Sequence, residues 1–130
     1  MPVRAEARAI RETLRSNIAR PWPLEQLSAL VHLSKKQLTR VFAQAYGKTP
    51  HAYLIMLRVE EMARLLRESN QTITTIGKRV GWRSRSRAID AFREYVGMSP
   101  SEYRTRHARI AKPALSSRQP TGNATVEAEK

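Results

Sequence analysis

Two groups of side chains in this sequence are suited to binding a polyanion, and each group lies beside a serine. The first follows Ser34 and comprises Lys35, Lys36, Gln37, Thr39 and Arg40. The second surrounds Ser84 and comprises Arg83, Arg85, Ser86, Arg87, Ile89, Asp90 and Arg93. Serine is a preferred N-cap, so both groups fall in the first turns of predicted helices, where free backbone N–H groups also attract phosphate. Arginine and lysine can bond guanine O6 and N7, and threonine can contact the thymine methyl.

The overall charge agrees with a polyanionic partner. The chain has 24 Lys and Arg against 11 Asp and Glu, a formal net charge of +13 on 130 residues. Such an excess makes nucleic acid the first candidate and an anionic membrane surface the second. No run of about 18 apolar residues occurs, and residues 1–20 carry charges throughout, so we expect neither a membrane span nor a secretory signal. These features are typical of a cytoplasmic protein, here one associated with the nucleoid.

Enzymatic and metal chemistry is not indicated. The chain has no cysteine, which excludes disulfides and thiolate zinc sites. The histidines, His32, His51 and His107, are too far apart in sequence to form a metal-binding spacing. The chain also lacks a glycine-rich phosphate loop and a carboxylate–histidine pair at helical spacing. We therefore expect no catalytic residue, no metal and no cofactor, and we do not expect an enzyme.

Apolar periodicity predicts an all-α fold of about seven helices. The predicted helices cover 3–19, a short segment from 24, 35–46, 50–69, a second short segment from 73, 85–96, and a last segment from 100 towards 109. The inner face of the short helix from 24 is expected to consist of Leu24, Leu27, Leu30 and Val31. The predicted division is a helix-turn-helix lobe over 3–49, a linker helix over 50–69 and a second lobe over 70–109. Residues 110–130 hold few large apolar side chains and are expected to be a disordered tail.

The two halves of the chain repeat one another. Leu24, Leu27, Ser28 and Val31 recur about 50 residues later as Ile73, Ile76, Gly77 and Val80. In the same order, Ser34, Phe42, Gly47, Thr49, Pro50 and Tyr53 recur as Ser84, Phe92, Gly97, Ser99, Pro100 and Tyr103. The small residues Ser28 and Gly77 are expected to allow close approach of the two helices in each unit. A plain helical-hairpin repeat without a DNA role is the alternative, and the matched cationic helices argue against it.

The helix predicted between the two units has a suitable length for two-site DNA reading. Its roughly 20 residues span about 30 Å at 1.5 Å per residue. Recognition helices in successive major grooves on one face of DNA lie ~34 Å apart. A single chain, acting as a monomer, can therefore present two helix-turn-helix units to double-stranded DNA.

Two stretches of the second unit, and their counterparts in the first, carry a family resemblance. The stretches are Ile73–Trp82 and Phe92–Arg104, and the counterparts are Leu38–Phe42, Gly47 and Thr49–Pro50. Together they resemble the DNA-binding domain of the AraC/XylS family. The resemblance implies two helix-turn-helix lobes joined by a long helix, and activation of transcription through contacts with DNA and RNA polymerase. It implies that the base-facing residues are Lys36, Thr39, Arg40, Arg85, Ser86, Ile89 and Asp90. The phosphate-facing residues are then expected to be Ser34, Lys35, Gln37, Arg83, Ser84, Arg87 and Arg93.

The second unit departs from the family pattern. Asp90 stands where the family often has arginine, Ile89 where it is usually polar, and Ala88 where it has an aromatic residue. Asp90 either accepts from a cytosine N4 or pairs with Arg87 or Arg93 on its own helix. Ile89 either contacts a thymine methyl or packs. We expect the first unit to carry more of the base specificity and the second to act more through phosphate.

Three functional hypotheses remain at this point. The first is a transcription regulator that reads a defined site, the second an architectural DNA binder with weak specificity, and the third a module that binds polymerase or another regulator. Ile55 and Met56, which are unusual for the family, are either a partner surface or packed against Trp22 or the first helix. Only about 20 residues precede the first unit, so no effector pocket of ordinary size is expected, and the chain is similar to small stand-alone family members.

Overall fold

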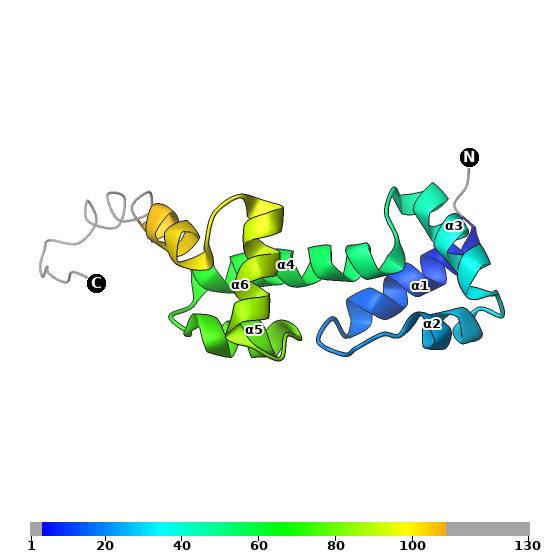
Figure 1. Ribbon diagram of the computed structural model, residues 1–130, viewed down its shortest axis with the longest axis horizontal. Helices are drawn as coiled ribbons and strands as arrows, with labels where there is room; N and C mark the ends of the chain where they lie inside the picture. Colours follow the sequence, from blue (N-terminus) through cyan, green and yellow to red (C-terminus); the bar gives the residue numbers. More distant parts are fainter. Residues whose placement is uncertain (1–3, 109–130) are drawn as a thin grey trace, which may run out of the picture.

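The described helices form an elongated molecule, in which α1–α3 lie at one end, α5 and α6 lie towards the other, and α4 connects the two (Figure 1). The computed structural model describes residues 4–108, so the predicted tail at 110–130 lies outside the described residues. The helices are α1 Ala5–Ser16, α2 Leu24–Leu30, α3 Lys35–Tyr46, α4 Pro50–Glu68, α5 Ile73–Val80 and α6 Arg85–Val96. Residues 100–108 are also helical, and no strand occurs within 4–108. The predicted all-α fold is confirmed.

Local capping chemistry sets most of the helix starts. The side chains of Ser34, Thr49, Thr72 and Ser84 each accept a hydrogen bond from the backbone N–H three residues ahead. Pro50 occupies the first turn of α4, where its missing N–H removes no helical hydrogen bond. Each of these starts was predicted, because the signal lies within four residues of the cap itself.

The end of α1 differs from the prediction. The helix ends at Ser16 instead of near residue 19. Asn17 leaves the helical conformation, at φ −158° and ψ 84°. The loop that follows is held from outside the helix: Trp22 Nε1 donates to the Asn17 carbonyl oxygen at 2.9 Å, and Arg58 Nε donates to that of Ile18 at 2.7 Å. Because these donors come from outside the helix, apolar periodicity alone overestimated its length.

The long helix α4 contributes to two separate apolar clusters. Its first half supplies Tyr53, Leu54 and Leu57 to a first core with α1, α2 and α3. Its second half supplies Val59, Met62, Leu65 and Leu66 to a second core with α5 and α6. We call the parts around these cores the first and second lobes.

None of the described helices, α4 included, is long and apolar enough to cross a membrane.

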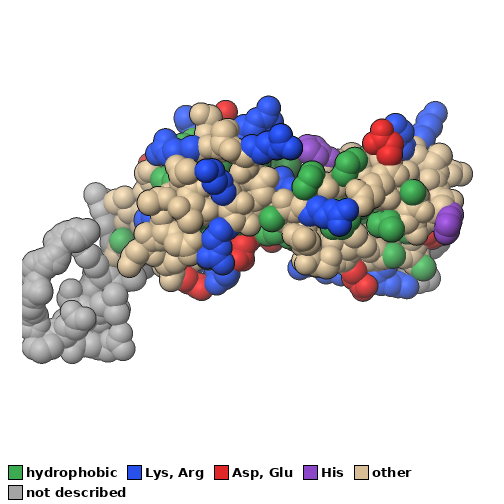
Figure 2. Space-filling view, turned by 90° about the horizontal axis from the view of Figure 1, so that it is seen from below, with side chains coloured by type: hydrophobic (Ala, Val, Ile, Leu, Met, Phe, Trp, Pro, Cys, Tyr) green, Lys and Arg blue, Asp and Glu red, His purple; other side chains and the backbone are tan. Residues whose placement is uncertain are grey.

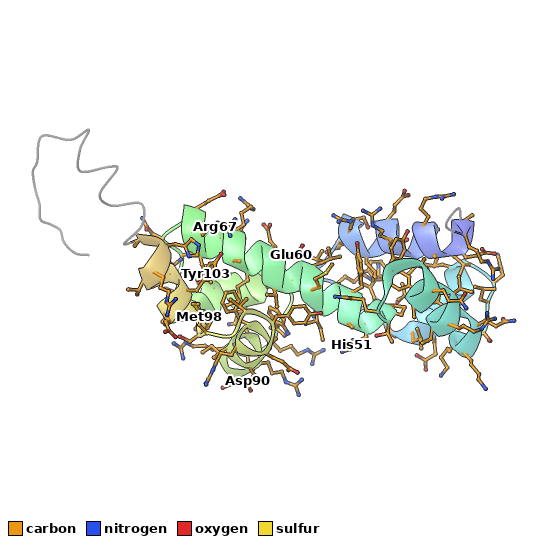
Figure 3. All side chains as sticks on the ribbon, turned by 90° about the horizontal axis from the view of Figure 1, so that it is seen from above. His51, Glu60, Arg67, Asp90, Met98 and Tyr103 are labelled. Carbon is orange, nitrogen blue, oxygen red and sulfur yellow. The ribbon has the colours of Figure 1, made fainter. Side chains whose placement is uncertain are left out.

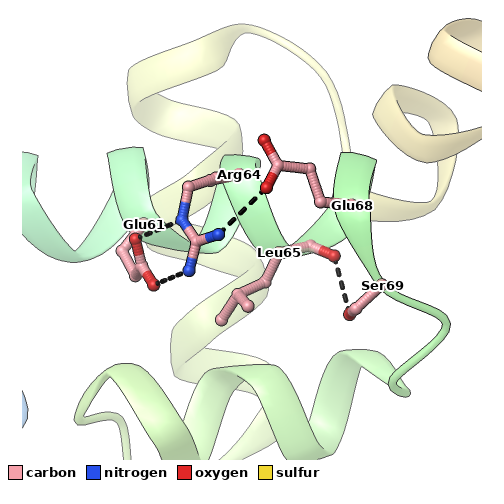
Figure 4. Close-up of polar contacts among 5 residues, drawn as sticks. All are labelled: Glu61, Arg64, Leu65, Glu68 and Ser69. Atoms are coloured by element: carbon pink, nitrogen blue, oxygen red, sulfur yellow. Dashed lines mark hydrogen bonds and ion pairs between the residues drawn. The ribbon is translucent and has the colours of Figure 1, made fainter.

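The end of α4 is held by polar contacts on its outer side (Figure 4). Arg64 donates to both carboxylate oxygens of Glu61, at 2.9 and 2.6 Å, and to Glu68 at 3.0 Å. These hydrogen bonds raise the pKa of Arg64 and lower that of Glu61. The Leu65 carbonyl in the last turn accepts both the Ser69 hydroxyl, at 2.8 Å, and the Ser69 backbone N–H, at 3.0 Å.

A tyrosine at matching positions of the repeat anchors the helix that follows each helix-turn-helix unit. In the first lobe Arg11 Nε donates to the Tyr53 hydroxyl at 3.0 Å. In the second lobe Arg67 donates to the Tyr103 hydroxyl at 2.8 Å. Each tyrosine ring also meets a buried phenylalanine edge-on, Phe42 at 5.4 Å and Phe92 at 5.3 Å between centroids. The sequence repeat therefore extends to a tertiary contact.

The predicted inner face of α2 needs one correction. Leu30 is 53% exposed, whereas Ser28 is buried at 7%. The inward set is Leu24, Leu27, Ser28 and Val31, the spacing that one helix face presents, and Leu30 falls outside it. The small Ser28 is therefore on the inner side of α2, and its carbonyl accepts the Leu33 N–H in the turn before α3.

Gly77 shows why a small residue is needed at this position in the second lobe. A Cβ atom added to Gly77 would lie 2.9 Å from the Cβ of Ala88, which is itself fully buried. The small residue at 88 therefore matches the glycine opposite, and α5 and α6 meet almost backbone to backbone.

We expect Gly77→Ala to lower the free energy of unfolding by about 1–3 kcal/mol through overpacking, despite a gain of about 1 kcal/mol in helix propensity. Chemical denaturation would measure the change. Lys78→Ala, at an exposed position of the same helix, is the control and should stay within about 0.5 kcal/mol. A Gly77→Ala protein as stable as this control would show that α5 and α6 are not in tight contact.

Candidate nucleic-acid interface

Each candidate recognition helix follows a tight turn that fixes its direction. In the first lobe the turn between α2 and α3 holds His32 at φ 59°, the one non-glycine residue of 4–108 with positive φ. In the second lobe Gly81 occupies the turn after α5 at φ 118°. Both turns close on the small residue of the preceding helix, because the N–H of Leu33 bonds the Ser28 carbonyl and that of Trp82 bonds the Gly77 carbonyl. The two units therefore share one backbone plan.

The helix α3 presents two unpartnered cations to solvent. Leu38, Val41 and Phe42 are buried, so the opposite side of α3 faces outward. Lys36 and Arg40 lie on that side, exposed, and no hydrogen bond or ion pair holds either of them within residues 4–108. Thr39 is half-buried beside them. A hollow at the surface brings together Leu24, Glu25, Ser34, Lys35, Lys36, Gln37, Thr39 and Arg40.

Three of the predicted phosphate-facing residues of this lobe have other contacts. Ser34 and Gln37 form a reciprocal capping box, with the Ser34 N–H donating to Gln37 Oε1 at 3.0 Å and the Gln37 N–H donating to Ser34 Oγ at 3.1 Å. Lys35 lies 3.7 Å from a carboxylate oxygen of Glu25 in an exposed ion pair. Such a pair contributes at most about 1 kcal/mol, so Lys35 remains able to turn towards an anion. Glu25, which sequence analysis did not single out, lines the same hollow.

The helix α6 carries its cations in the same manner. Ala88 and Phe92 are buried, while Arg85, Ser86, Arg87 and Arg93 are exposed. Arg83, just before the cap, is exposed as well. Ser84 Oγ accepts from the Arg87 N–H at 3.1 Å, so this serine serves as the cap. Ile89 is half-buried beside the exposed set.

Asp90 does not form the intrahelical ion pair that was one of its two expected roles. The ion pairs of the described residues include none between Asp90 and Arg87 or Arg93. Its carboxylate is exposed and projects from α6 on the side away from α4 (Figure 3). On an exposed helix surface an i,i+3 pair gains only a few tenths of a kcal/mol, which does not fix the two side chains together. The other expected role, accepting a hydrogen bond from a base, requires a carboxylate that has no partner before DNA is bound.

The two sides of the molecule differ in how their charges are held. Glu60 and Arg67 lie on the side of α4 opposite to Asp90 (Figure 3). On that side Arg64 is neutralised by two glutamates and Arg67 is bonded to Tyr103. Figure 2 shows Lys and Arg side chains gathered on both halves of the molecule, with acidic side chains scattered among them. On α3 and α6, by contrast, Lys36, Arg40, Arg85, Arg87 and Arg93 are exposed and have no partner within the described residues.

Two other arginines are anchored and serve the fold. Arg104 donates to the carbonyls of Leu66 and Ser69, at 3.1 and 3.0 Å, and burial lowers its pKa. Arg58 donates to the carbonyls of Ile18 and Arg20, and burial lowers its pKa too. Neither arginine was assigned a structural role from the sequence. No signal within four residues of either identifies the carbonyls they reach.

The unusual pair on α4 is packed inside the molecule. Ile55 packs against the second core and Met56 against the first. Lys48 Nζ also lies 3.7 Å from the Met56 sulfur. Burial against Trp22 or the first helix was one of the two interpretations of this pair, and the core that Met56 packs against contains side chains of α1 and has Trp22 packed against it as well. The described residues also contain no group of three side chains able to hold a metal ion.

Comparison with known proteins gives a consistent result. A family model described as a helix-turn-helix domain matches residues 27–106, more than half of the chain. A putative AraC-like transcription regulator of Streptomyces lividans is 37% identical over 86 residues, which is 66% of this chain and 28% of that protein. The chain spans less than a third of the length of the curated relatives it matches first.

Solved structures agree on the arrangement of helices. The C-terminal domain of AraT, a response regulator from Geobacillus stearothermophilus, aligns with a TM-score of 0.77 and 25% identity over 81% of this chain and 88% of that one. The DNA-binding domain of AdpA, a global transcriptional factor solved with a target DNA, aligns with a TM-score of 0.72 and 26% identity over 90% of this chain and 98% of that one.

Proposed function

Since the chain belongs to the AraC-type helix-turn-helix family of transcription regulators, we propose that it reads a defined sequence of double-stranded DNA by placing α3 and α6 in successive major grooves. The observation that carries the proposal is the pair of capped helices whose outward cations, apart from Lys35, have no partner in the described residues. One chain then does what a dimer of single helix-turn-helix units does. In this proposal the protein is a regulator rather than an enzyme, acts as a monomer, and works at the nucleoid.

In the first lobe the base-reading residues are Lys36, Thr39 and Arg40. Lys36 and Arg40 are one turn apart on the outward side of α3, so both side chains can enter one groove. Arginine and lysine match the two acceptors of guanine, and the threonine methyl matches that of thymine. The free N–H groups at the start of α3 and the side chain of Lys35 then contact phosphate, which fixes the depth of the helix.

In the second lobe Arg85, Ser86, Ile89 and Asp90 face the bases. The free Asp90 carboxylate is suited to a cytosine N4 donor and repels phosphate, which makes this helix selective at one base pair. The surrounding arginines, Arg83, Arg87 and Arg93, supply the phosphate contacts. We therefore assign more of the base specificity to α3 and more of the salt-dependent affinity to α6.

The test is selection of bound duplexes from a randomised DNA library at moderate salt, followed by sequencing. Two enriched blocks ~10 bp apart are expected, one for each recognition helix. One block would restrict base reading to a single lobe. Salt-sensitive binding without any motif would favour the architectural alternative, and absence of binding would favour a module that binds another protein.

Salt dependence separates phosphate contacts from base contacts in the second lobe. We expect Arg87→Ala to weaken binding to all duplexes alike and to reduce the slope of log K against log salt by about 1. Arg79→Ala, an exposed arginine of the hollow on the opposite side of the molecule, is the matched control and should leave the slope unchanged. An unaltered slope for Arg87→Ala would remove this residue from the phosphate contacts.

Membership of the AraC-type family is also the basis for proposing that the protein activates transcription by contacting RNA polymerase. The outer side of α4 and the end of α1 form a second hollow lined by charged side chains, away from the proposed DNA side. A polymerase contact on that side is compatible with simultaneous DNA binding. An in vitro transcription assay on a promoter carrying the selected motif would distinguish an activator from a repressor.

A further inference from the structure

The two lobes meet at a junction built around one arginine. Arg58 lies in the middle of α4, where its Nε donates to the Ile18 carbonyl at 2.7 Å and its Nη2 donates to the Arg20 carbonyl at 3.0 Å. Both carbonyls belong to the loop that follows α1 in the first lobe. A planar guanidinium can bond two such acceptors at once, whereas a lysine ammonium reaches them less precisely.

The same guanidinium also contacts the second lobe. Its Cζ lies 6.0 Å from the centroid of the Trp82 ring. A Cβ atom added to Gly81 would lie 2.7 Å from the Cζ and Nε of Arg58 and 2.9 Å from the Cα of Ala19. The turn before α6 is therefore pressed against both Arg58 and the loop that Arg58 holds. Ile18, in that loop, packs against both cores.

A second contact joins the lobes through α6 itself. The Tyr95 hydroxyl donates to the Ala52 carbonyl at 3.2 Å, near the start of α4. Lys48, in the loop after α3, places its Nζ 5.6 Å from the centroid of the Tyr95 ring. Tyr95 is 42% exposed, so we expect this contact to stabilise the arrangement of the lobes less than the contacts of Arg58 do.

We propose that Arg58 is a positioning residue for DNA recognition, which fixes the orientation of the second helix-turn-helix unit against the first and so sets the spacing of the base pairs that α3 and α6 read. The continuous helix α4 fixes the separation of the lobes, but each lobe covers only about half of it. The junction opposes rocking of one lobe about that helix. This inference rests on the proposed two-lobe reading of DNA.

The orientation can be measured without DNA. The chain has no cysteine, so spin labels can be attached at Gln44→Cys on α3 and Glu94→Cys on α6, both exposed positions. Pulsed electron spin resonance is expected to give a narrow distance distribution for the otherwise unchanged protein. Arg58→Met should broaden it, and Arg58→Lys, which keeps charge and length but lacks the planar fork, should broaden it less.

Arg104→Met is the matched control. Arg104 makes the equivalent pair of hydrogen bonds, to Leu66 and Ser69, but within the second lobe alone. Its loss should destabilise that lobe without broadening the distance between α3 and α6. Circular dichroism of each variant establishes that the helices are retained. Should Arg58→Met fail to fold, Arg58→Lys carries the comparison.

The DNA consequence is tested on the duplexes selected by the protein, with one base pair inserted or deleted between the two blocks. We expect the protein to lose about tenfold or more in affinity for the altered spacings, and Arg58→Met to lose much less. An unchanged distance distribution in the folded Arg58 variants would overturn the inference, as would a broadened one with spacing preference intact. A selection that yields no motif refutes the proposed function instead, and the distance result still stands by itself.

Discussion

Replacing Phe92 by alanine is expected to lower the free energy of unfolding of the second lobe by about 3–5 kcal/mol. Phe92 is fully buried in the second core and meets Tyr103 edge-on. Its removal leaves a cavity that the short helices α5 and α6 cannot fill without losing their own contacts. Because a small domain has a total stability of about 5–15 kcal/mol, this loss should leave the second lobe close to unfolding.

The two tryptophans allow each lobe to be followed separately. Trp22 packs against the first core and Trp82 against the second. Single-tryptophan proteins, made with Trp82→Phe or Trp22→Phe, report one lobe each during urea unfolding. In the Phe92→Ala background the Trp82 transition should move to lower urea by more than the Trp22 transition, and Phe42→Ala should reverse the order. Coincident transitions in both variants would show that the lobes unfold as one unit.

On the proposed interface, Lys36→Ala and Arg40→Ala are each expected to cost about 1–3 kcal/mol of DNA-binding free energy and to relax the preference at particular base pairs. Both side chains are exposed and without a partner in the described residues, so their loss removes an intermolecular contact and leaves the fold intact. The measurement is titration of the selected duplex and of duplexes with single base changes in its first block. The two effects are not expected to add, since both cations enter the same groove.

Arg15→Ala is the control for these variants. Arg15 is exposed at the end of α1 and lines the hollow that includes Glu60, on the side away from Asp90. The substitution removes the same charge without touching α3, and should change affinity only slightly and equally for all duplexes. If Lys36→Ala and Arg40→Ala behaved like Arg15→Ala, α3 would not read bases.

The helices and their caps were predictable because their signals are local. The serine and threonine caps and the glycine stops at Gly47 and Gly97 act within four residues of the helix end. The repeat added the pairing of helices within each lobe, and at Gly77 it also marked the close approach of α5 to α6.

The contacts between distant segments were not predictable in this way. Arg58 reaches carbonyls 40 and 38 residues earlier in the chain, and Tyr95 reaches one 43 residues earlier. The contact from Arg58 also holds the loop after α1, where a longer helix was predicted. For the site, the sequence indicated which side chains face outward on α3 and α6, but not that Asp90 would lack its intrahelical partner. The assignment of individual residues to bases or phosphates, and the exact limits of the two lobes, stay predictions.

The division of α4 between two cores limits how this chain can be taken apart or recombined. A fragment ending at residue 68 would expose Met62, Leu65 and Leu66, and one beginning at residue 50 would expose Tyr53, Leu54 and Leu57. Neither recognition unit is therefore an interchangeable module, and chimaeras that join half of this protein to half of a relative are expected to aggregate. Transfer of a new DNA preference should instead succeed by grafting the few outward residues of α3 or α6 onto the intact scaffold.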